Sequence, residues 1–516
     1  MNKLIIPIIV IAILAAGIGA FFAFQNPAYP EPQKQTLPQA QTNKLCGDGV
    51  CDDFEKAHPN ACPQDCKSQT AVSSTPTQSA TPITATSEQS TKTTKSQKQI
   101  NWDSPFGIYS PYGEFEIDRA DFSNSQEISG YLKDLGVKWV QELPFSKNFG
   151  AIPEDINIYT RIGREGGMKP GKDLDEKYRQ ALKESIRSNK GYIRYYEVDT
   201  EPDGVGGWGS NPQGYAELLK ATYSVVKEEC PECKVIFGGL SGGKVKEDLE
   251  STSSQFLEKV LESGAIGYFD GIEFKQHHIG SKDYPLIINK FEAIKKTLSR
   301  HGLDIRKMHV FMETATHDGN PNYPVPNSID SGLSVQTEEE QAEGLIKIYV
   351  TALSSGVKKV FWNLIFERDD YEKRPDGRSF PQNPFNHYGL VSNPNNGGVL
   401  HKKLSYFSYK KMVEVLDGSD WNNIQTIQEK DGVYIYKFQK GGKKIWVAWN
   451  DNSAEKQITI TGIGAQQVKI TEAVPKYESG KEVTDYNTAF NTETKSVSAG
   501  KITITLDDKP VFVEEK

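Results

Sequence analysis

The chain has 516 residues, and its 60 Lys and Arg residues against 68 Asp and Glu residues give a formal net charge of -8. The length suits two or three domains. Mild acidity argues against nucleic-acid binding, which needs a basic surface facing the phosphates. Hydrophobic residues make up 37% and aromatic residues 10%, a composition that excludes a wholly disordered chain and a protein with many membrane spans.

Residues 1–25 contain an uncharged apolar segment, Leu4 to Phe24, that follows Lys3. At 1.5 Å per residue a helix of this length crosses the hydrocarbon core of a bilayer. The apolar stretch is longer than that of a cleaved signal peptide, which remains the alternative. With Lys3 kept inside, the sequence predicts a single-pass protein of the cell membrane whose later domains are extracytoplasmic.

A Cys-rich module is expected at residues 45–67, between a Pro- and Gln-rich spacer (26–44) and a flexible Ser- and Thr-rich linker (68–100). In an exported chain its cysteines predict two disulfides; they are Cys46, Cys51, Cys62 and Cys66. The same stretch holds acidic residues, including Asp48, Asp52, Asp53 and Glu55. Their oxygens suit a structural calcium ion. The alternative is a disulfide knot with solvated acids, and zinc is less favoured because exported thiols oxidise.

Strand-like and helix-like stretches alternate in residues 101–418. Eight short apolar runs are expected as strands: 106–109, 137–140, 157–161, 193–198, 235–238, 271–274, 309–312 and 360–364. Helical patterns between them include 213–229, 251–263, 287–301 and 338–355. Alternation predicts a parallel sheet, and the count of eight predicts closure into a (β/α)8 TIM barrel. An open doubly wound sheet is disfavoured because no Gly-rich phosphate turn follows the first strand.

Two glutamates follow strands that face each other across such a barrel. Glu201 comes after the fourth strand, and Glu313 comes at the end of the seventh. Barrel enzymes place their chemistry at the carboxyl ends of the strands, so the two carboxylates should converge over the mouth. A retaining glycoside hydrolase needs such a pair, one group to protonate the leaving oxygen and one to attack the anomeric carbon.

The chain resembles the clan A retaining glycoside hydrolases, with features of the β-xylosidase/iduronidase and endoglycanase families. The resemblance rests on Glu313, on Thr200-Glu201-Pro202, and on the flanking stretches 208–220, 234–240, 389–391 and 400–409. It implies that Glu201 is the acid/base and Glu313 the nucleophile, with no cofactor required for catalysis. It also implies sugar-binding roles for His277, His278, Trp362, Trp208 and Tyr109.

Two positions depart from the clan's pattern. Thr200 stands where an Asn normally hydrogen-bonds the sugar, and Gln141 stands where an Arg commonly steadies the nucleophile. We therefore expect a membrane-anchored glycoside hydrolase acting on a polysaccharide or glycoconjugate, with a non-catalytic surface lectin or adhesin as the alternative. A metal-dependent barrel hydrolase is a third interpretation, but no third ligand accompanies His277 and His278 at a recognisable spacing.

Two further features complete the chain. Cys230 and Cys233 precede the fifth strand, and an oxidising compartment predicts a disulfide between them. From about Trp421 the pattern changes to period two, as in 433–438, 444–449, 457–461 and 501–505. The sequence thus predicts an antiparallel β-sandwich over residues 419–516, acting as a scaffold.

Overall fold

The computed structural model describes residues 102–109, 125–142, 152–204, 206–241, 251–277, 279–319, 333–368, 387–394 and 399–516. The predicted signal anchor, the spacer, the Cys-rich module with its disulfides and calcium site, and the linker all lie outside these ranges, and so does His278. Among the helices within them, none combines the length and the apolarity that a membrane crossing requires.

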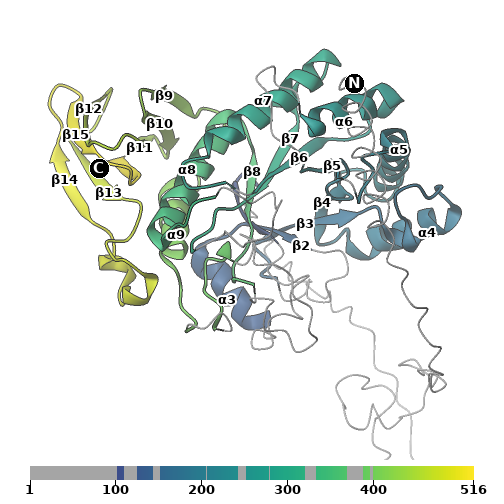
Figure 1. Cartoon of the computed structure of the whole chain (residues 1–516), viewed down its shortest axis with the longest axis horizontal. Coiled ribbons are helices and arrows are strands. Elements are labelled where there is room, and N and C mark those ends of the chain that lie inside the picture. The colour runs from purple at the N-terminus through teal and green to yellow at the C-terminus, as the bar shows by residue number, and fades with distance from the viewer. Residues whose placement is uncertain are drawn as a thin grey trace, which may run out of the picture. The chain divides into compact units, whose positions relative to one another are not determined.

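Eight parallel strands close into a barrel in chain order, as the sequence predicts (Figure 1). They are β1 (Phe106–Tyr109), β2 (Trp139–Glu142), β3 (Asn157–Ile162), β4 (Ile193–Val198), β5 (Lys234–Leu240), β6 (Gly271–Gln276), β7 (His309–Thr314) and β8 (Lys359–Trp362). The bounds of each predicted run agree with those of the observed strand to within two residues at each end. In the part of the barrel where the site forms, strand pairing places Arg161 of β3 opposite Glu197 of β4. It also places Lys275 of β6 opposite Glu313 of β7.

Helices surround the barrel on its outside (Figure 1). They are α3 (Ser125–Leu135), α4 (Glu176–Asn189), α5 (Pro212–Glu229), α6 (Thr252–Val260), α7 (Pro285–Arg300), α8 (Glu338–Ser355) and α9 (Leu404–Leu416). Local sequence sets their ends. Thr337 and Glu340 form a capping box at the start of α8, and Gly356, in a left-handed conformation, ends that helix.

The barrel interior has an apolar floor below a polar upper part. Side chains of alternate strand residues fill the floor, namely Trp139, Tyr159, Ile236, Phe311 and Phe361, with Tyr195 partly buried beside them. At the next inward-facing position of several strands, two residues closer to the carboxyl end, the side chains are charged or polar instead. Because successive strand residues point to opposite faces, this change places a buried polar layer at the carboxyl ends of the strands.

The C-terminal domain is an antiparallel β structure of two unequal sheets. The larger sheet has the order β14-β13-β16-β11-β10-β9, and β12 and β15 form a separate two-stranded sheet. The strands are β9 (Gln425–Lys430), β10 (Val433–Lys440), β11 (Lys443–Asn450), β12 (Lys456–Thr461), β13 (Gln467–Glu472), β14 (Thr492–Ser496), β15 (Lys501–Leu506) and β16 (Val511–Glu515). Trp446 and Val513 belong to the core shared with the smaller sheet, whereas Tyr436 and Phe512 belong to the core shared with the barrel.

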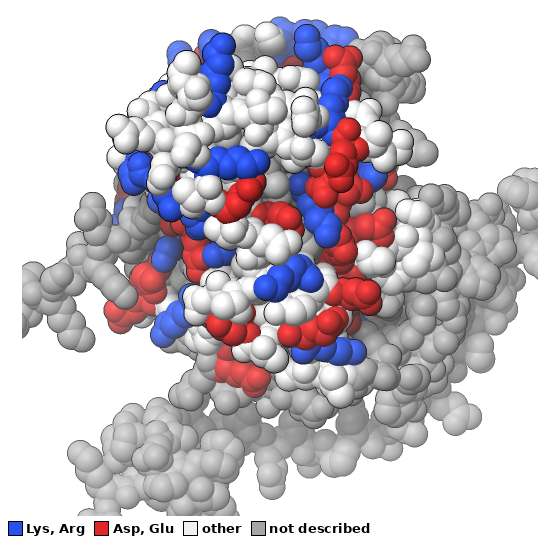
Figure 2. All heavy atoms as spheres, turned by 90° about the vertical axis from the view of Figure 1, so that its left-hand side faces the viewer, with Lys and Arg blue, Asp and Glu red and all other residues white. Residues whose placement is uncertain are grey.

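Buried polar contacts join this domain to the barrel. Asp451 accepts hydrogen bonds from Lys347 Nζ (3.0 Å) on α8 and from the Tyr284 hydroxyl (2.6 Å). Seen from the side of this domain, Lys and Arg side chains alternate with Asp and Glu among uncharged residues (Figure 2). Cys230 and Cys233 are joined by a disulfide, with their Cα atoms 5.3 Å apart.

Candidate active site

Glu201 is presented by a strained turn directly after β4. Asp199 and Glu201 both adopt left-handed conformations (φ 57° and 47°), which cost non-glycine residues on the order of 1–3 kcal/mol. Hydrogen bonds hold the turn: Glu201 N–H donates to Gly239 O (3.0 Å), and Asp199 accepts from Trp208 Nε1 (3.0 Å) and Arg164 Nε (2.8 Å). The Glu201 side chain, half exposed, thereby reaches the barrel mouth and can exchange protons with solvent.

Glu313, at the end of β7, is almost completely buried and has several donors around its carboxylate. Asn363 Nδ2 donates to Oε1 (2.7 Å), His277 Nε2 lies 3.2 Å from the same oxygen, and Lys275 Nζ lies 2.6 Å from Oε2. Burial opposes ionisation, but the charge of Lys275 and the contacts with His277 outweigh it and hold the pKa of Glu313 below its ordinary value. The group is therefore an anion fixed in one orientation.

Lys275 Nζ connects the two glutamates. It lies 2.6 Å from Glu313 Oε2 and 3.8 Å from Glu201 Oε1. These two carboxylate oxygens can therefore be no farther apart than the sum of those distances. The two carboxyl groups of a glycosidase lie about 5–5.5 Å apart in retaining enzymes and about 6.5–9.5 Å apart in inverting ones, and this upper limit is compatible with such a pair.

A network of buried polar groups supports these residues from below. Glu197 accepts from Arg161 Nε (3.1 Å), Gln141 Nε2 (3.0 Å) and the Gly239 N–H (2.9 Å). Burial first, and then the charge of Glu197, raises the pKa of Glu273 well above its ordinary value. Arg161 pairs with Glu197 and Lys275 pairs with Glu313, so each of these two carboxyls has a cationic partner.

Several of the predicted site residues lie close together in the structure. Glu201, Glu313 and His277 come together at the barrel mouth, with His277 stacked on Tyr388. Tyr109 lies in the barrel wall, where its hydroxyl accepts from Arg161 (2.9 Å) and its ring centre lies 5.5 Å from Lys275 Nζ. Their roles toward a substrate stay predictions.

Two other predicted sugar contacts need correction, and Gln141 bonds to residues other than the nucleophile. Trp362 is fully buried; its Nε1 donates to Tyr388 O (3.0 Å), and its ring stacks on Tyr349 of α8, outside the barrel. Trp208 is also buried and fixes the turn through Asp199. Neither ring offers a face to a sugar in this structure. Gln141 is buried and bonds Glu197 and Glu273 rather than serving as a substitute for an arginine at the nucleophile.

Thr200 lies beside the proposed acid. Its N–H donates to Asp199 Oδ1 (2.7 Å), and its buried Oγ1 has no hydrogen-bond partner among the described residues. The sugar contact of Thr200 stays a prediction.

Sequence reasoning missed four residues that build the site, namely Lys275, Arg161, Glu197 and Asn363. A signal for three of them was present, because residues with polar groups, charged or tyrosine, stand two apart in Glu273-Phe-Lys275, Tyr159-Thr-Arg161 and Tyr195-Tyr-Glu197. Such alternation inside an otherwise apolar barrel strand points polar groups inward.

One cluster of potential metal ligands lies in the described part of the chain. Asp318, Glu367 and His387 bring one ligand atom each to within 4.8 Å of one another. Lys403 Nζ, however, lies 2.8 Å from both carboxylates. Because this buried ammonium already pairs with both acids, the cluster is an internal ion-pair network and gives no support to a metal-dependent hydrolase.

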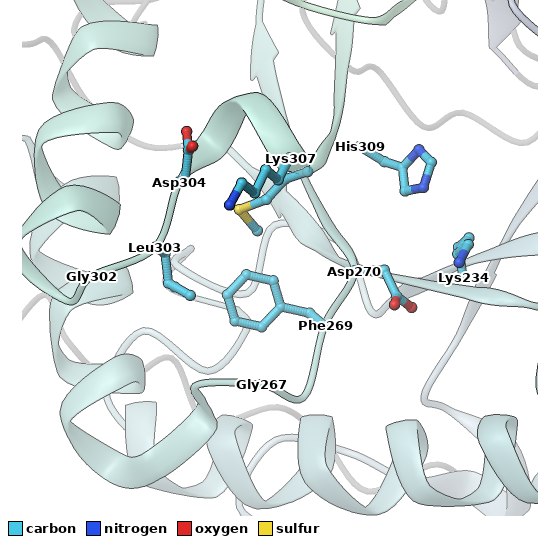
Figure 3. Close-up of a pocket in the computed structure, with 10 residues that line it drawn as sticks. Lys234, Gly267, Phe269, Asp270, Gly302, Leu303, Asp304, Lys307 and His309 are labelled. Atoms are coloured by element: carbon cyan, nitrogen blue, oxygen red, sulfur yellow. The ribbon is translucent and has the colours of Figure 1, made fainter.

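A cavity of about 390 Å³ lies at the opposite end of the barrel (Figure 3). Lys234 and His309, which begin β5 and β7, line it together with Phe269 and Asp270. Burial lowers the pKa of His309 to about 4, so the ring is neutral near pH 7. This end of a barrel ordinarily serves stability rather than chemistry, and the cavity is not part of the carboxylate site.

Comparison with solved structures identifies relatives in fold. A family 39 glycoside hydrolase from the gut symbiont Bacteroides cellulosilyticus WH2 matches with a TM-score of 0.56 at 14% identity, covering 80% of this chain and 81% of that one. An α-L-arabinofuranosidase from Thermotoga maritima matches with a TM-score of 0.52 at 12% identity, covering 80% and 96%. The family 51 α-L-arabinofuranosidase from Thermotoga petrophila RKU-1 gives the same TM-score, identity and coverage.

Comparisons of the sequence with known proteins and families find fewer similarities. No curated protein matches this sequence. A family described as "RET, Cysteine Rich Domain" matches residues 26–99, which lie outside the described residues and include the predicted Cys-rich module. The structural similarity is one of fold: the chain carries an eight-stranded parallel barrel like those of these glycoside hydrolases, followed by an antiparallel β domain.

Proposed function

We propose that this protein is a retaining glycoside hydrolase that cleaves O-glycosidic bonds through Glu201 and Glu313. The observation that carries the proposal is the placement of both carboxylates on one ammonium at the barrel mouth, with Nζ–O distances of 3.8 Å and 2.6 Å. Glu313 is buried and ionised, as a nucleophile requires, while Glu201 is half exposed, as suits a group that exchanges protons with water.

The reaction proceeds in two balanced steps. First, a Glu313 oxygen attacks the anomeric carbon, the bond to the leaving oxygen breaks, and Glu201 gives its proton to that oxygen. Second, water attacks the same carbon, Glu201 takes a proton from the water, and the ester bond to Glu313 breaks. The sugar leaves with its original anomeric configuration, and both glutamates return to their starting protonation states.

Hydrolysis assays with matched variants test the proposal. The purified exported part is assayed on a panel of 2,4-dinitrophenyl glycosides, namely the β-D-glucoside, β-D-xyloside, β-D-galactoside and α-L-arabinofuranoside. Wild type should hydrolyse at least one, Glu313→Ala should be inactive, and Glu201→Ala should regain turnover when azide replaces water as the nucleophile. Sugar binding without hydrolysis by any form would favour the lectin or adhesin alternative, and activity that survives Glu313→Ala would contradict the mechanism.

We also propose that the enzyme works outside the cytoplasm, anchored in the cell membrane by residues 1–25, on a polysaccharide or glycoconjugate. The apolar segment from Leu4 to Phe24 and the disulfide between Cys230 and Cys233 support an exported chain. Deleting residues 1–25 should move the protein from the membrane fraction to the soluble fraction. A structural calcium ion in residues 45–67 remains part of the proposal, and calcium-dependent protection of that module from proteolysis tests it.

A further inference from the structure

The Lys275 ammonium lies between the two catalytic glutamates and is unequally shared by them. It is closer to Glu313 Oε2 (2.6 Å) than to Glu201 Oε1 (3.8 Å), and the Lys275 side chain is only 5% exposed. Lys275 thus contacts both carboxylates. Burial disfavours the charged form of Lys275, but the charge of Glu313 outweighs it and raises the pKa of the ammonium. The positive charge is therefore permanent at working pH.

The surrounding structure fixes this position. Lys275 stands opposite Glu313 in the β6–β7 ladder, and its carbonyl accepts from Lys290 Nζ of α7 (2.5 Å). Gly239 of β5 leaves room for the side chain, since a Cβ atom there would lie 2.9 Å from Lys275 Cε. The ammonium thus has a built site from which it can reach either carboxylate by a small movement.

Every strand packed against Lys275 contributes to its electrostatic surroundings. The charged and titratable groups that face it or its two carboxylates are Tyr109 (β1), Arg161 (β3), Glu197 (β4), Glu273 (β6), His277 and Lys290 (α7). Arg161 is paired with Glu197, and burial raises the pKa of Glu273 well above its ordinary value. Burial lowers the pKa of Lys290 to about 8, and its amine bonds backbone oxygens. The groups whose charge changes during the reaction are therefore Glu313 and Glu201, and Lys275 lies between them.

We propose that Lys275 is a positioning residue that transfers its ion pair from Glu313 to Glu201 when the glycosyl-enzyme forms. In the free enzyme the ammonium is held by Glu313, at 2.6 Å, and lies farther from Glu201, at 3.8 Å. Once Glu313 is esterified it has lost its charge, and the ammonium is left with Glu201, which has just given up its proton. The new ion pair stabilises Glu201 as the base that activates water. The transfer occurs only in the proposed glycosidase reaction and rests on that function.

The test separates the two chemical steps. With the 2,4-dinitrophenyl glycoside that wild type hydrolyses fastest, formation of the glycosyl-enzyme is followed as a burst of dinitrophenolate and its breakdown as the steady-state rate. The leaving group needs no proton, so Glu201 matters only in the second step. Lys275→Met should slow breakdown about tenfold at pH 6. The apparent pKa of the acid limb in the pH–rate profile of breakdown should rise by about one unit, which corresponds to that tenfold change.

Two controls distinguish this role from a structural one. Azide, which attacks without a base, should restore breakdown in Lys275→Met as it does in Glu201→Ala, and Lys275→Arg should retain the wild-type profile because it keeps the charge. If Lys275→Met does not fold, Lys275→Gln is measured in the same way.

The outcomes are separable. A neutral variant with the wild-type pH profile, or with both steps slowed equally and no azide rescue, would overturn the transfer while leaving the glycosidase intact. The transfer would also be overturned if Lys275→Met and Lys275→Gln both failed to fold while Lys275→Arg folded. The charge of Lys275 would then be required for folding. Lack of hydrolysis by wild type, together with no ester on Glu313 after treatment with the matching 2-fluoro glycosides, would overturn the proposed function and the transfer with it.

Discussion

Arg161 on β3 and Glu197 on β4 stand opposite each other in the ladder, and Arg161 Nε donates to Glu197 Oε2 across 3.1 Å. The Glu197 side chain is completely buried, and its carboxylate accepts two further hydrogen bonds, from Gln141 and from the Gly239 N–H. This pair forms the support on which Lys275 and Glu313 rest. The proposed catalytic arrangement thus depends on an ion pair below the two glutamates.

Replacing Glu197 by Leu should strongly destabilise the protein. The change leaves the largely buried guanidinium of Arg161 without its counter-ion, and breaking a buried pair from one side costs about 3–5 kcal/mol. Urea unfolding followed by circular dichroism measures the loss. Arg187→Met is the control, because Arg187 pairs with Glu229 on the surface and should change stability little. Equal small losses in the two variants would contradict the supporting role of Glu197.

Replacing Gly239 by Ala should reduce activity more than stability. The new Cβ atom would lie 2.9 Å from Lys275 Cε and 3.1 Å from Glu273 Oε1, so the flexible lysine must move away from the glutamates. We expect kcat/KM to fall by at least about tenfold, equivalent to about 1.4 kcal/mol, with a stability loss of about 1–2 kcal/mol. Gly191→Ala is the control, since nothing lies within 4 Å of its added Cβ. A folded Gly239→Ala protein with full activity would refute this prediction.

Glu338 should make the contact between the barrel and the β domain sensitive to acid. Burial opposes its ionisation, but hydrogen bonds from His401, Gly480, Ser479 and Leu404 lower its pKa to about 2. A carboxyl with a depressed folded-state pKa contributes stability that is present above its ordinary pKa and is lost as the pH falls through the folded value. His401, whose pKa is raised in the folded state, stays protonated over that range.

The free energy of unfolding should therefore fall between about pH 5 and pH 2, with a contribution from Glu338 on the order of 2 kcal/mol. Glu338→Gln should be less stable at pH 6 and should show a shallower decrease over the same range. Glu176→Gln, at an exposed position of α4, should retain the wild-type slope. The same slope in wild type and Glu338→Gln would show that other acids control acid unfolding.

Replacing Asp451 by Ala should loosen the β domain from the barrel. The Lys347 side chain is completely buried, and without Asp451 its remaining carboxylate is Glu343, 3.3 Å away, while Tyr284 loses its acceptor. We expect a stability loss of about 3 kcal/mol and faster proteolytic cleavage near residue 419. Asp508→Ala, which breaks the surface pair with Lys282, should leave both properties nearly unchanged.

The barrel could be predicted because its signal is repeated eight times along the chain. Each strand is a short apolar run between helical patterns, and errors of one or two residues at the ends do not alter the count. The two glutamates could be found because both follow strands, at the end where barrel enzymes carry their chemistry.

The inward or outward direction of each strand residue could not be predicted in the same way. Both faces of a barrel strand are buried, so apolar residues occupy both faces and the phase of the alternation is hidden. A shift of one residue exchanges the faces: Phe361 packs inside the barrel, whereas its neighbour Trp362 packs against Tyr349 outside it. The partner of Glu313 was missed for a related reason, because Lys275 is far from it in sequence and adjacent only in the β6–β7 register.

Covalent trapping tests the central claim most directly. The purified exported part is incubated with 2-deoxy-2-fluoro glycosides bearing a dinitrophenyl leaving group, digested with a protease, and analysed by mass spectrometry. The account predicts one fluoroglycosyl ester per chain, on the peptide that contains Glu313, and none on the Glu313→Ala variant. An enzyme that hydrolyses the parent glycoside but carries the label on another residue, or carries none, would contradict the assignment of Glu313 as the nucleophile.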